Sequence, residues 1–133
     1  MTILRISEAA SIAMHTVFIL ASKADESLST KDIATSLSVS ENHLSKVLQR
    51  LTRAGLVISI RGPKGGFKLN PDKKDITLLE VYEAIDGPLQ MSDCLLDRQV
   101  CHGNCLLGGL IASINKEVTE YLSKTSIIDF VKQ

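Results

Sequence analysis

The sequence predicts a mainly α-helical protein with one small β-hairpin and one long helix near the C-terminus. Apolar residues recur at helical spacing up to residue 54 and again beyond residue 105. Between these regions, residues 56–60 are rich in Val and Ile, and a Gly/Pro turn separates them from a short apolar stretch at residues 67–69. Two such stretches joined by such a turn predict a hairpin.

The composition is that of an ordinary globular domain. The chain has 133 residues, a formal net charge of +0, 44% apolar residues and 23% charged residues, all typical of one soluble domain. The apolar patch at residues 12–21 is interrupted by His15 and Thr16 and is too short to span a bilayer. No secretory signal pattern opens the chain. We therefore expect a cytoplasmic protein with no membrane partner.

The first part of the chain predicts three helices, at residues 8–24, from residue 30 to about residue 37, and at residues 41–54. Each follows a serine that can accept a hydrogen bond from the free backbone N–H groups of the first turn. These capping serines are Ser7, Ser29 and Ser40. Because only residues 38–40 separate the second helix from the third, this pair predicts a helix-turn-helix.

The third of these helices has one apolar face and one polar face. Its apolar residues recur at i, i+3, i+4 and i+7, which predicts a buried stripe. They are Leu44, Val47, Leu48 and Leu51. The region around it is basic, because residues 43–74 hold eight Lys or Arg and one acid, a net charge of +7 in 32 residues. A basic helix face is most often a solvated surface, but the helix-turn-helix favours DNA binding.

The hairpin directly after this helix predicts a wing. Its turn, residues 61–66, contains three glycines and one proline. The glycines permit positive φ and let backbone N–H groups approach a phosphate. Arg61 or Lys64 could enter the minor groove. The simpler interpretation, a tight turn that needs these residues only for its geometry, stays open beside this one.

Beyond the hairpin, Thr77 and Glu80 form a capping box that predicts another helix, ending at Gly87. Residues 91–104 follow neither helical nor strand periodicity, so we expect a loop there.

From Cys105 onwards the pattern is helical again. Apolar residues spaced by 4, 3, 4 and 3 form a seam along this helix. They are Leu107, Ile111, Ile114, Val118 and Tyr121. Such a seam is typical of a helix that packs along a partner helix, so we favour a dimerisation helix. Packing on the domain's own core is the alternative. A short terminal helix is expected at residues 127–131.

All three cysteines, Cys94, Cys101 and Cys105, fall within twelve residues. In a reducing compartment such a cluster is more often metal-binding or redox-active than a structural disulfide. Thiolates suit an iron–sulfur cluster and zinc alike, and zinc would add His102 as a ligand. A redox thiol switch and inert cysteines are the remaining alternatives.

Three blocks of the sequence together resemble the Rrf-two family of bacterial winged-helix transcription regulators, of the IscR and NsrR type. The blocks are residues 51–57 (LTRAGLV), 59–69 (SIRGPKGGFKL) and 76–87 (ITLLEVYEAIDG), followed by the cysteines. The first two are specific in combination, and the resemblance covers about residues 3–131. It implies a winged helix-turn-helix plus a long dimerisation helix.

The resemblance also implies a homodimer and an iron–sulfur cluster, 2Fe–2S or 4Fe–4S, on Cys94, Cys101 and Cys105. In the nitric-oxide-sensing members of the family, the fourth ligand is an acid of the first helix supplied by the other subunit. Glu8 occupies the matching position. An acid in the first turn of a helix also stabilises the helix dipole without any metal, which is the alternative role for Glu8.

DNA contacts are expected on the polar face of the 41–54 helix and on the wing. The resemblance implies that Asn42 and Ser45 match base-contacting positions and that Arg61 matches a wing arginine. The full predicted set is Asn42, His43, Ser45, Lys46, Gln49, Arg50, Arg61, Lys64 and Gly65. Within it, Lys46, Arg50 and Lys64 are expected to bind phosphates largely without sequence preference.

These features predict three parts. They are a winged helix-turn-helix at residues 1–90, whose first helix also lies at the dimer interface, a cluster-binding loop at 91–105, and a dimerisation helix with its tail at 106–133. The expected partners are operator DNA, a second copy of the chain and, indirectly, RNA polymerase.

The predicted function is a sequence-specific DNA-binding regulator, acting as a repressor. Its DNA affinity would be gated by an iron–sulfur cluster that responds to redox state, nitric oxide, or iron and cluster supply. A cluster-free thiol-redox regulator, a zinc-responsive regulator and a winged-helix protein-interaction module are the alternatives. An enzyme is not expected, because we find no catalytic Ser/His/acid set, phosphate loop or C-x-x-C pair in a credible context.

Overall fold

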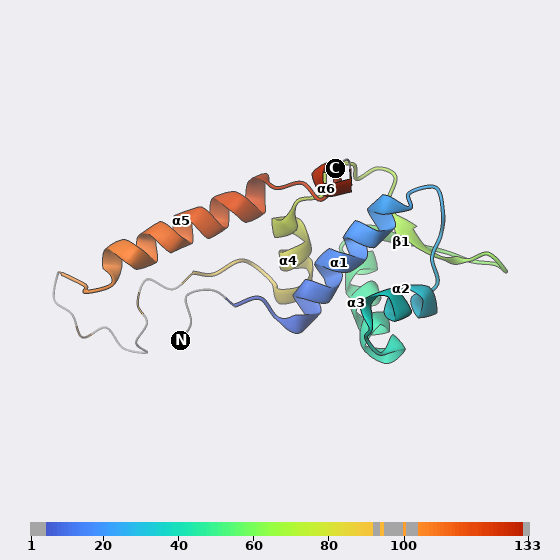
Figure 1. The fold of residues 1–133 in the computed structure, drawn as a ribbon, viewed down its shortest axis with the longest axis horizontal. Helices are drawn as coiled ribbons and strands as arrows, with labels where there is room; N and C mark the ends of the chain where they lie inside the picture. The colour runs from blue at the N-terminus through green and yellow to red at the C-terminus, as the bar shows by residue number, and fades with distance from the viewer. Residues whose placement is uncertain (1–4, 92–93, 95–99, 101–103, 132–133) are drawn as a thin grey trace.

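The computed structural model describes residues 5–91, 94, 100 and 104–131 (Figure 1). Across these residues the chain is mainly helical and has one antiparallel hairpin. The elements are, in order, α1 (Glu8–Ser22), α2 (Thr30–Leu37), α3 (Glu41–Arg53), β1 (Val57–Ile60), β2 (Gly66–Leu69), α4 (Leu78–Asp86), α5 (Gly108–Lys124) and α6 (Ile128–Val131). The predicted fold class, a winged helix-turn-helix followed by a long helix, is confirmed.

Helix α1 is the central element of the winged-helix part and contacts α3, α4, α6 and β2. The predicted cap is present, because Ser7 Oγ accepts a 3.0 Å hydrogen bond from the backbone N–H of Ala10. The buried side chains of α1 form the middle of the core: Ala10, Ile12, Ala13, Thr16, Val17 and Leu20. The helix ends at Ser22 and not at residue 24, because Lys23 leaves the helical conformation (φ −123°, ψ 51°).

Helices α2 and α3 meet at a tight turn, as expected. Ser38 begins this turn in the left-handed region, with φ 56° and ψ 43°. Ser29 and Ser40 cap the two helices by accepting 3.0 Å hydrogen bonds from the N–H groups of Asp32 and His43. The predicted apolar stripe of α3 is 0–1% exposed along its length: Leu44, Val47, Leu48 and Leu51.

The wing is held to the domain by a third backbone segment. Strands β1 and β2 pair with Ser59 opposite Phe67. Each strand ends at the predicted residue and starts within one residue of the predicted start. Phe67 also exchanges two backbone hydrogen bonds, of 2.9 and 2.7 Å, with Leu28 in the α1–α2 connection. Gly66 permits this approach, since a Cβ there would lie 2.3 Å from the Leu28 carbonyl oxygen and its φ is +155°.

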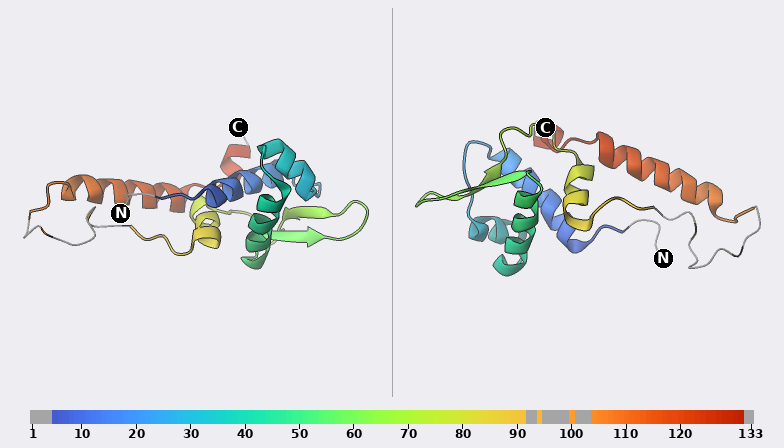
Figure 2. Two further views of the ribbon diagram at one scale, coloured as in Figure 1. Left: turned by 90° about the horizontal axis from the view of Figure 1, so that it is seen from below. Right: turned by 180° about the vertical axis from the view of Figure 1, so that it is seen from behind.

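The last helices are joined to the domain at the start of α4. The predicted capping box between Thr77 and Glu80 is present. Backbone N–H of Leu78 donates to the Thr125 carbonyl (3.1 Å), just after α5. From this anchored end, α5 runs away from the wing as an arm (Figure 2).

Helix α5 begins later than expected, at Gly108 and not at Cys105. Leu106 and Leu107 form a turn ahead of it. Leu107 stands at the N-cap, and its apolar side chain makes no capping hydrogen bond.

Candidate nucleic-acid interface and cysteine segment

The polar face of α3 lies opposite its buried stripe. Because an α-helix turns about 100° per residue, Asn42, Lys46, Gln49 and Arg53 lie along one line on this face. All four side chains are exposed. Ser45 lies beside this line towards the wing and is half-buried. The structure therefore brings together four predicted contacts, and it adds Arg53, which is absent from the predicted set.

Arg50 is oriented differently from these residues. Its Nη1 donates a 2.9 Å hydrogen bond to the backbone carbonyl of Ile85, in the last turn of α4. His43 is half-buried and lies on the same side of α3 as Arg50, because the separation of seven residues between these positions makes nearly two helical turns. Arg50 thus joins the recognition helix to α4, a role that the sequence pattern did not predict.

The wing presents Arg61 and Lys64 as exposed side chains. Its turn is braced from behind, because Ser27 Oγ donates a 2.6 Å hydrogen bond to the Lys64 carbonyl. The N–H of Gly65 donates to the Gly62 carbonyl at 2.9 Å, so this group is already used within the turn. A Cβ on Gly65 would lie 2.3 Å from the Ile60 carbonyl oxygen. The geometry of the turn therefore requires glycine at this position.

The last turn of α4 is bonded to the start of α1 as well as to α3. Ser7 donates to the Asp86 carboxylate through both its hydroxyl (2.7 Å) and its N–H (3.3 Å). Nearby, Tyr82 donates its hydroxyl to the Arg5 carbonyl at 3.1 Å. Burial, followed by the charge of Asp86, raises the pKa of Tyr82 above its usual value, so it remains a donor at neutral pH.

The chain leads from this junction into the cysteine segment. Cys94 is half-buried and Cys105 is exposed, while Cys101 and His102 lie outside the described residues. Within the described part of the chain, no group of three or more His, Cys, Asp or Glu side chains is placed to hold a metal ion. Glu8 is exposed at the first position of α1.

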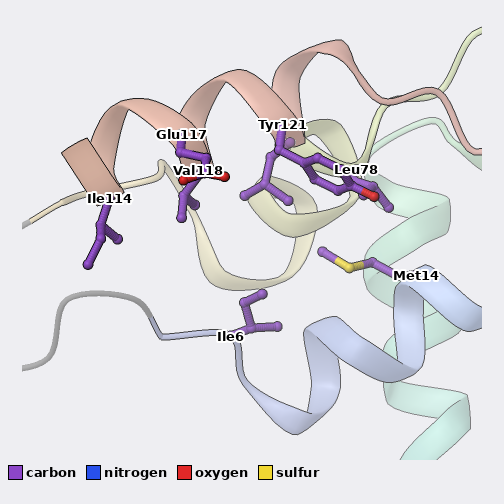
Figure 3. Close-up of a pocket in the computed structure, with 8 residues that line it drawn as sticks. Ile6, Met14, Leu78, Ile114, Glu117, Val118 and Tyr121 are labelled. Carbon is purple, nitrogen blue, oxygen red and sulfur yellow. The ribbon is translucent and has the colours of Figure 1, made fainter.

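An apolar groove lies between α1, α5 and α6. One cleft of about 390 Å³ is lined by Ile6 and Met14 below and by the α5 seam above (Figure 3). A second cleft of about 410 Å³ shares Met14 and Leu78 with it and adds Phe18 and Phe130. Of the predicted seam, Ile114, Val118 and Tyr121 line the first cleft. The α1 and α6 residues of this groove were not predicted.

A helix-turn-helix, a braced wing and a basic exposed face together define a winged-helix transcription regulator. The Rrf2 family model, described as "Iron-dependent Transcriptional regulator", matches residues 6–133. The chain therefore belongs to the Rrf2 family, and the predicted membership is confirmed. It follows that this is a regulator and not an enzyme, as expected.

Relatives within this family include two kinds of regulator. The chain is 33% identical over 102 residues to the HTH-type transcriptional regulator IscR of Photorhabdus laumondii, covering 75% of this chain but only 62% of that one. It is 32% identical over 120 residues to the HTH-type transcriptional regulator NsrR of Bacillus subtilis, covering 87% of this chain and 82% of that one.

Solved structures extend the likeness. CymR, the global cysteine regulator of B. subtilis, superposes with a TM-score of 0.80 at 29% identity and 97% coverage of both chains. IscR of T. potens superposes with a TM-score of 0.75 at 25% identity, covering 97% of this chain and 87% of that chain. Separately, among the described helices we find none with the length and apolar character needed to cross a membrane.

Proposed function

We propose that this regulator is a homodimeric repressor that binds a specific operator, with an affinity set by an iron–sulfur cluster held on Cys94, Cys101 and Cys105. The observation that carries the proposal is the continuity of three features along the chain. Helix α3, which carries the exposed basic face, is bonded through Arg50 to the last turn of α4, and α4 leads directly into the cysteine segment.

The donor set supports a cluster. Three thiolates are the ligands that iron–sulfur clusters take, and the family is described as iron-dependent. Glu8, exposed at the start of α1, would supply a carboxylate as the fourth ligand, reaching across to the partner's cysteines. When bound, the cluster would supply a centre that responds to oxidants, nitric oxide or iron supply.

The chain's own hydrogen bonds would carry such a signal to the DNA. Ser7, next to Glu8, is bonded to Asp86, and Arg50 is bonded to Ile85 one residue earlier. A shift of the cysteine segment would therefore pull on α1 and α3 together. Two recognition helices must lie about 34–36 Å apart to reach successive turns of the major groove, so a small rotation would weaken operator binding.

A thiol-redox regulator without a cluster is the second candidate. Its support is the similarity to CymR, which is named for cysteine regulation, together with the exposed Cys105. In this case oxidation of the thiols would move the same segment. The zinc-responsive regulator and the protein-interaction module have no comparable support from the described residues.

Operator binding by holo- and apo-protein tests the leading proposal. The protein is purified without air, and a duplex is selected with it from a random-sequence library. Salt titrations are then compared for the protein as purified, after chelation of iron, and after thiol oxidation. We expect a difference of at least about tenfold between holo- and apo-protein, about 1.4 kcal/mol. Equal affinities in all three states would remove the sensing function but keep the DNA-binding one.

The ligand role of Glu8 has a matched control in Glu41. Both are the first residue of a helix that a serine caps, so both substitutions to Ala remove the same dipole interaction. We expect Glu8→Ala, but not Glu41→Ala, to change the ultraviolet–visible and Mössbauer spectra, while Cys101→Ser abolishes them. Identical spectra for Glu8→Ala and the wild type would exclude this acid.

A further inference from the structure

A polar cleft lies between the recognition helix and the wing. Its volume is about 350 Å³, and its lining comes from α3, β1 and β2. The lining residues are Gln49, Thr52, Arg53, Ser59 and Phe67. Figure 2 shows α3 and the hairpin side by side. The three cleft residues that come from α3 lie in the C-terminal half of that helix.

The packing of the wing shapes this cleft. Ser59 and Phe67 are direct partners in the β1–β2 register, so their side chains project from the same face of the hairpin. Phe67 packs against the hydrophobic core and forms an apolar floor. Gln49 and Arg53 are four residues apart on α3 and therefore lie one above the other on the opposite wall.

The free polar groups of this cleft suit an anion. The side chain of Arg53 makes no hydrogen bond or ion pair with any residue that the structure describes. Its guanidinium presents a planar fork of donors that matches the oxygens of a phosphate. Gln49 and Ser59 are exposed and can add an amide and a hydroxyl donor. Thr52 contributes only shape, because its hydroxyl donates to the Leu48 carbonyl (2.7 Å).

A neighbouring hollow on the other side of Arg53 offers a useful contrast. It is lined by Arg50, Arg53 and the end of α4, including Asp86. There Arg50 already donates to Ile85, and the Asp86 carboxylate repels an anion. Among the residues that the structure describes, no acid lines the cleft on the wing side. The electrostatics therefore favour an anion between α3 and the wing.

We propose that Arg53, with Gln49 and Ser59, binds a backbone phosphate of the DNA in this cleft. The inference rests on the proposed DNA-binding function and deepens it. One phosphate held by both α3 and β1 fixes the angle between the recognition helix and the wing. Arg61 then enters the minor groove from a defined direction. Arg50, the nearby arginine that the sequence pattern predicts to bind phosphate, instead donates a hydrogen bond to Ile85 within the protein.

The dependence of DNA affinity on salt tests this site, and apo-protein suffices for it. Each phosphate contact contributes about −0.9 to the slope of log K against log salt. We expect Arg53→Gln to make the slope shallower by about 0.9 for each bound subunit and to weaken binding about tenfold, on the selected operator and on a random duplex alike. Lys116→Gln, which removes an exposed cation from α5, the helix that runs away from the wing, is the control and is expected to keep the wild-type slope.

Ser59→Ala provides a second measure. Removing one neutral donor is expected to weaken binding about two- to tenfold without changing the slope. Thermal unfolding of every variant separates these effects from stability, because a cation in the last turn of α3 also interacts with the helix dipole.

The outcomes separate this site from the function on which it rests. Wild-type protein that binds no duplex would remove the proposed function itself. Wild-type binding with an unchanged slope in Arg53→Gln would overturn the phosphate site alone. A loss in Arg53→Gln confined to one operator sequence would also overturn it, since that pattern marks a base contact.

Discussion

The winged-helix part and the α5 arm differ in how their apolar side chains are covered. In α3, Leu44 and Leu48 are 0% exposed. In and just before α5, Leu106 is 97% exposed, Leu110 54% and Tyr121 55%. The first part has a complete core of its own. The arm leaves an apolar surface exposed, which is the strongest structural support for the proposed second copy of the chain.

The same difference extends to the helix ends. Each long helix of the winged-helix part begins with a serine or threonine that accepts a backbone hydrogen bond. Helix α5 begins with Leu107, which forms no such bond. A helix without a cap depends more on packing for its stability. The comparison therefore suggests that α5 reaches its full stability in the assembled protein, and the following substitutions test this from the largest effect to the smallest.

The largest effect is expected from removing the same apolar side chain in the two parts. Leu48→Ala leaves a cavity in the core and should lower the free energy of unfolding by about 2–5 kcal/mol. Leu106→Ala should change it by less than about 0.5 kcal/mol in the dissociated protomer. Urea unfolding at one fixed protein concentration, low enough to keep the protomers apart, measures both. A loss at Leu106 as large as that at Leu48 would mean that Leu106 is covered within the protomer itself.

Glycine substitutions give the next contrast. Gly66→Ala would place a Cβ 2.3 Å from the Leu28 carbonyl oxygen at φ +155°, which should lower the free energy of unfolding by about 3 kcal/mol. Gly109→Ala in α5 meets nothing within 4 Å and should raise it by up to about 1 kcal/mol. Thermal unfolding gives both values. A stable Gly66→Ala variant would show that the wing can move away from Leu28.

A charge on the arm should act on assembly and leave the fold of the protomer intact. Tyr121→Asp puts a carboxylate on the exposed seam and should weaken the dimer at least about 30-fold, as loss of about 2 kcal/mol does. Thr119→Asp, two residues away on the opposite side of α5 and also exposed, is the control. Sedimentation equilibrium measures both constants. Equal dissociation constants for the two variants would move the interface away from this seam.

Much of the fold follows from local rules that the sequence displays. The capping serines, the buried stripe of α3 and the glycine after it obey short-range patterns. Gly55, which follows the C-cap of α3, has φ +80°, the left-handed conformation that commonly closes a helix. The start of α5 was misjudged, because apolar spacing alone predicts helix and carries no signal for the missing cap.

The candidate site was less predictable, because it depends on contacts between distant residues. Arg50 and Arg53 are both basic residues in the last turn of α3. Only the tertiary position of Ile85, which accepts a hydrogen bond from Arg50, tells them apart. The bond between Ser7 and Asp86 spans 79 residues in the same way. Helical periodicity does place Arg53 on the polar face, and this signal would have sufficed to add it to the predicted set, which omits it.

The smallest effect compares the two tyrosines of the chain. Tyr82→Phe removes the partly buried hydrogen bond to the Arg5 carbonyl and should cost about 1 kcal/mol, whereas Tyr121→Phe should change little in the protomer. Because burial raises the pKa of Tyr82, its contribution is complete below about pH 10 and is lost as the pH rises through the folded-state pKa. Unfolding followed from neutral to alkaline pH should therefore show the wild type approaching Tyr82→Phe at high pH. A constant difference across this range would mean that Tyr82 titrates as it does in the unfolded chain.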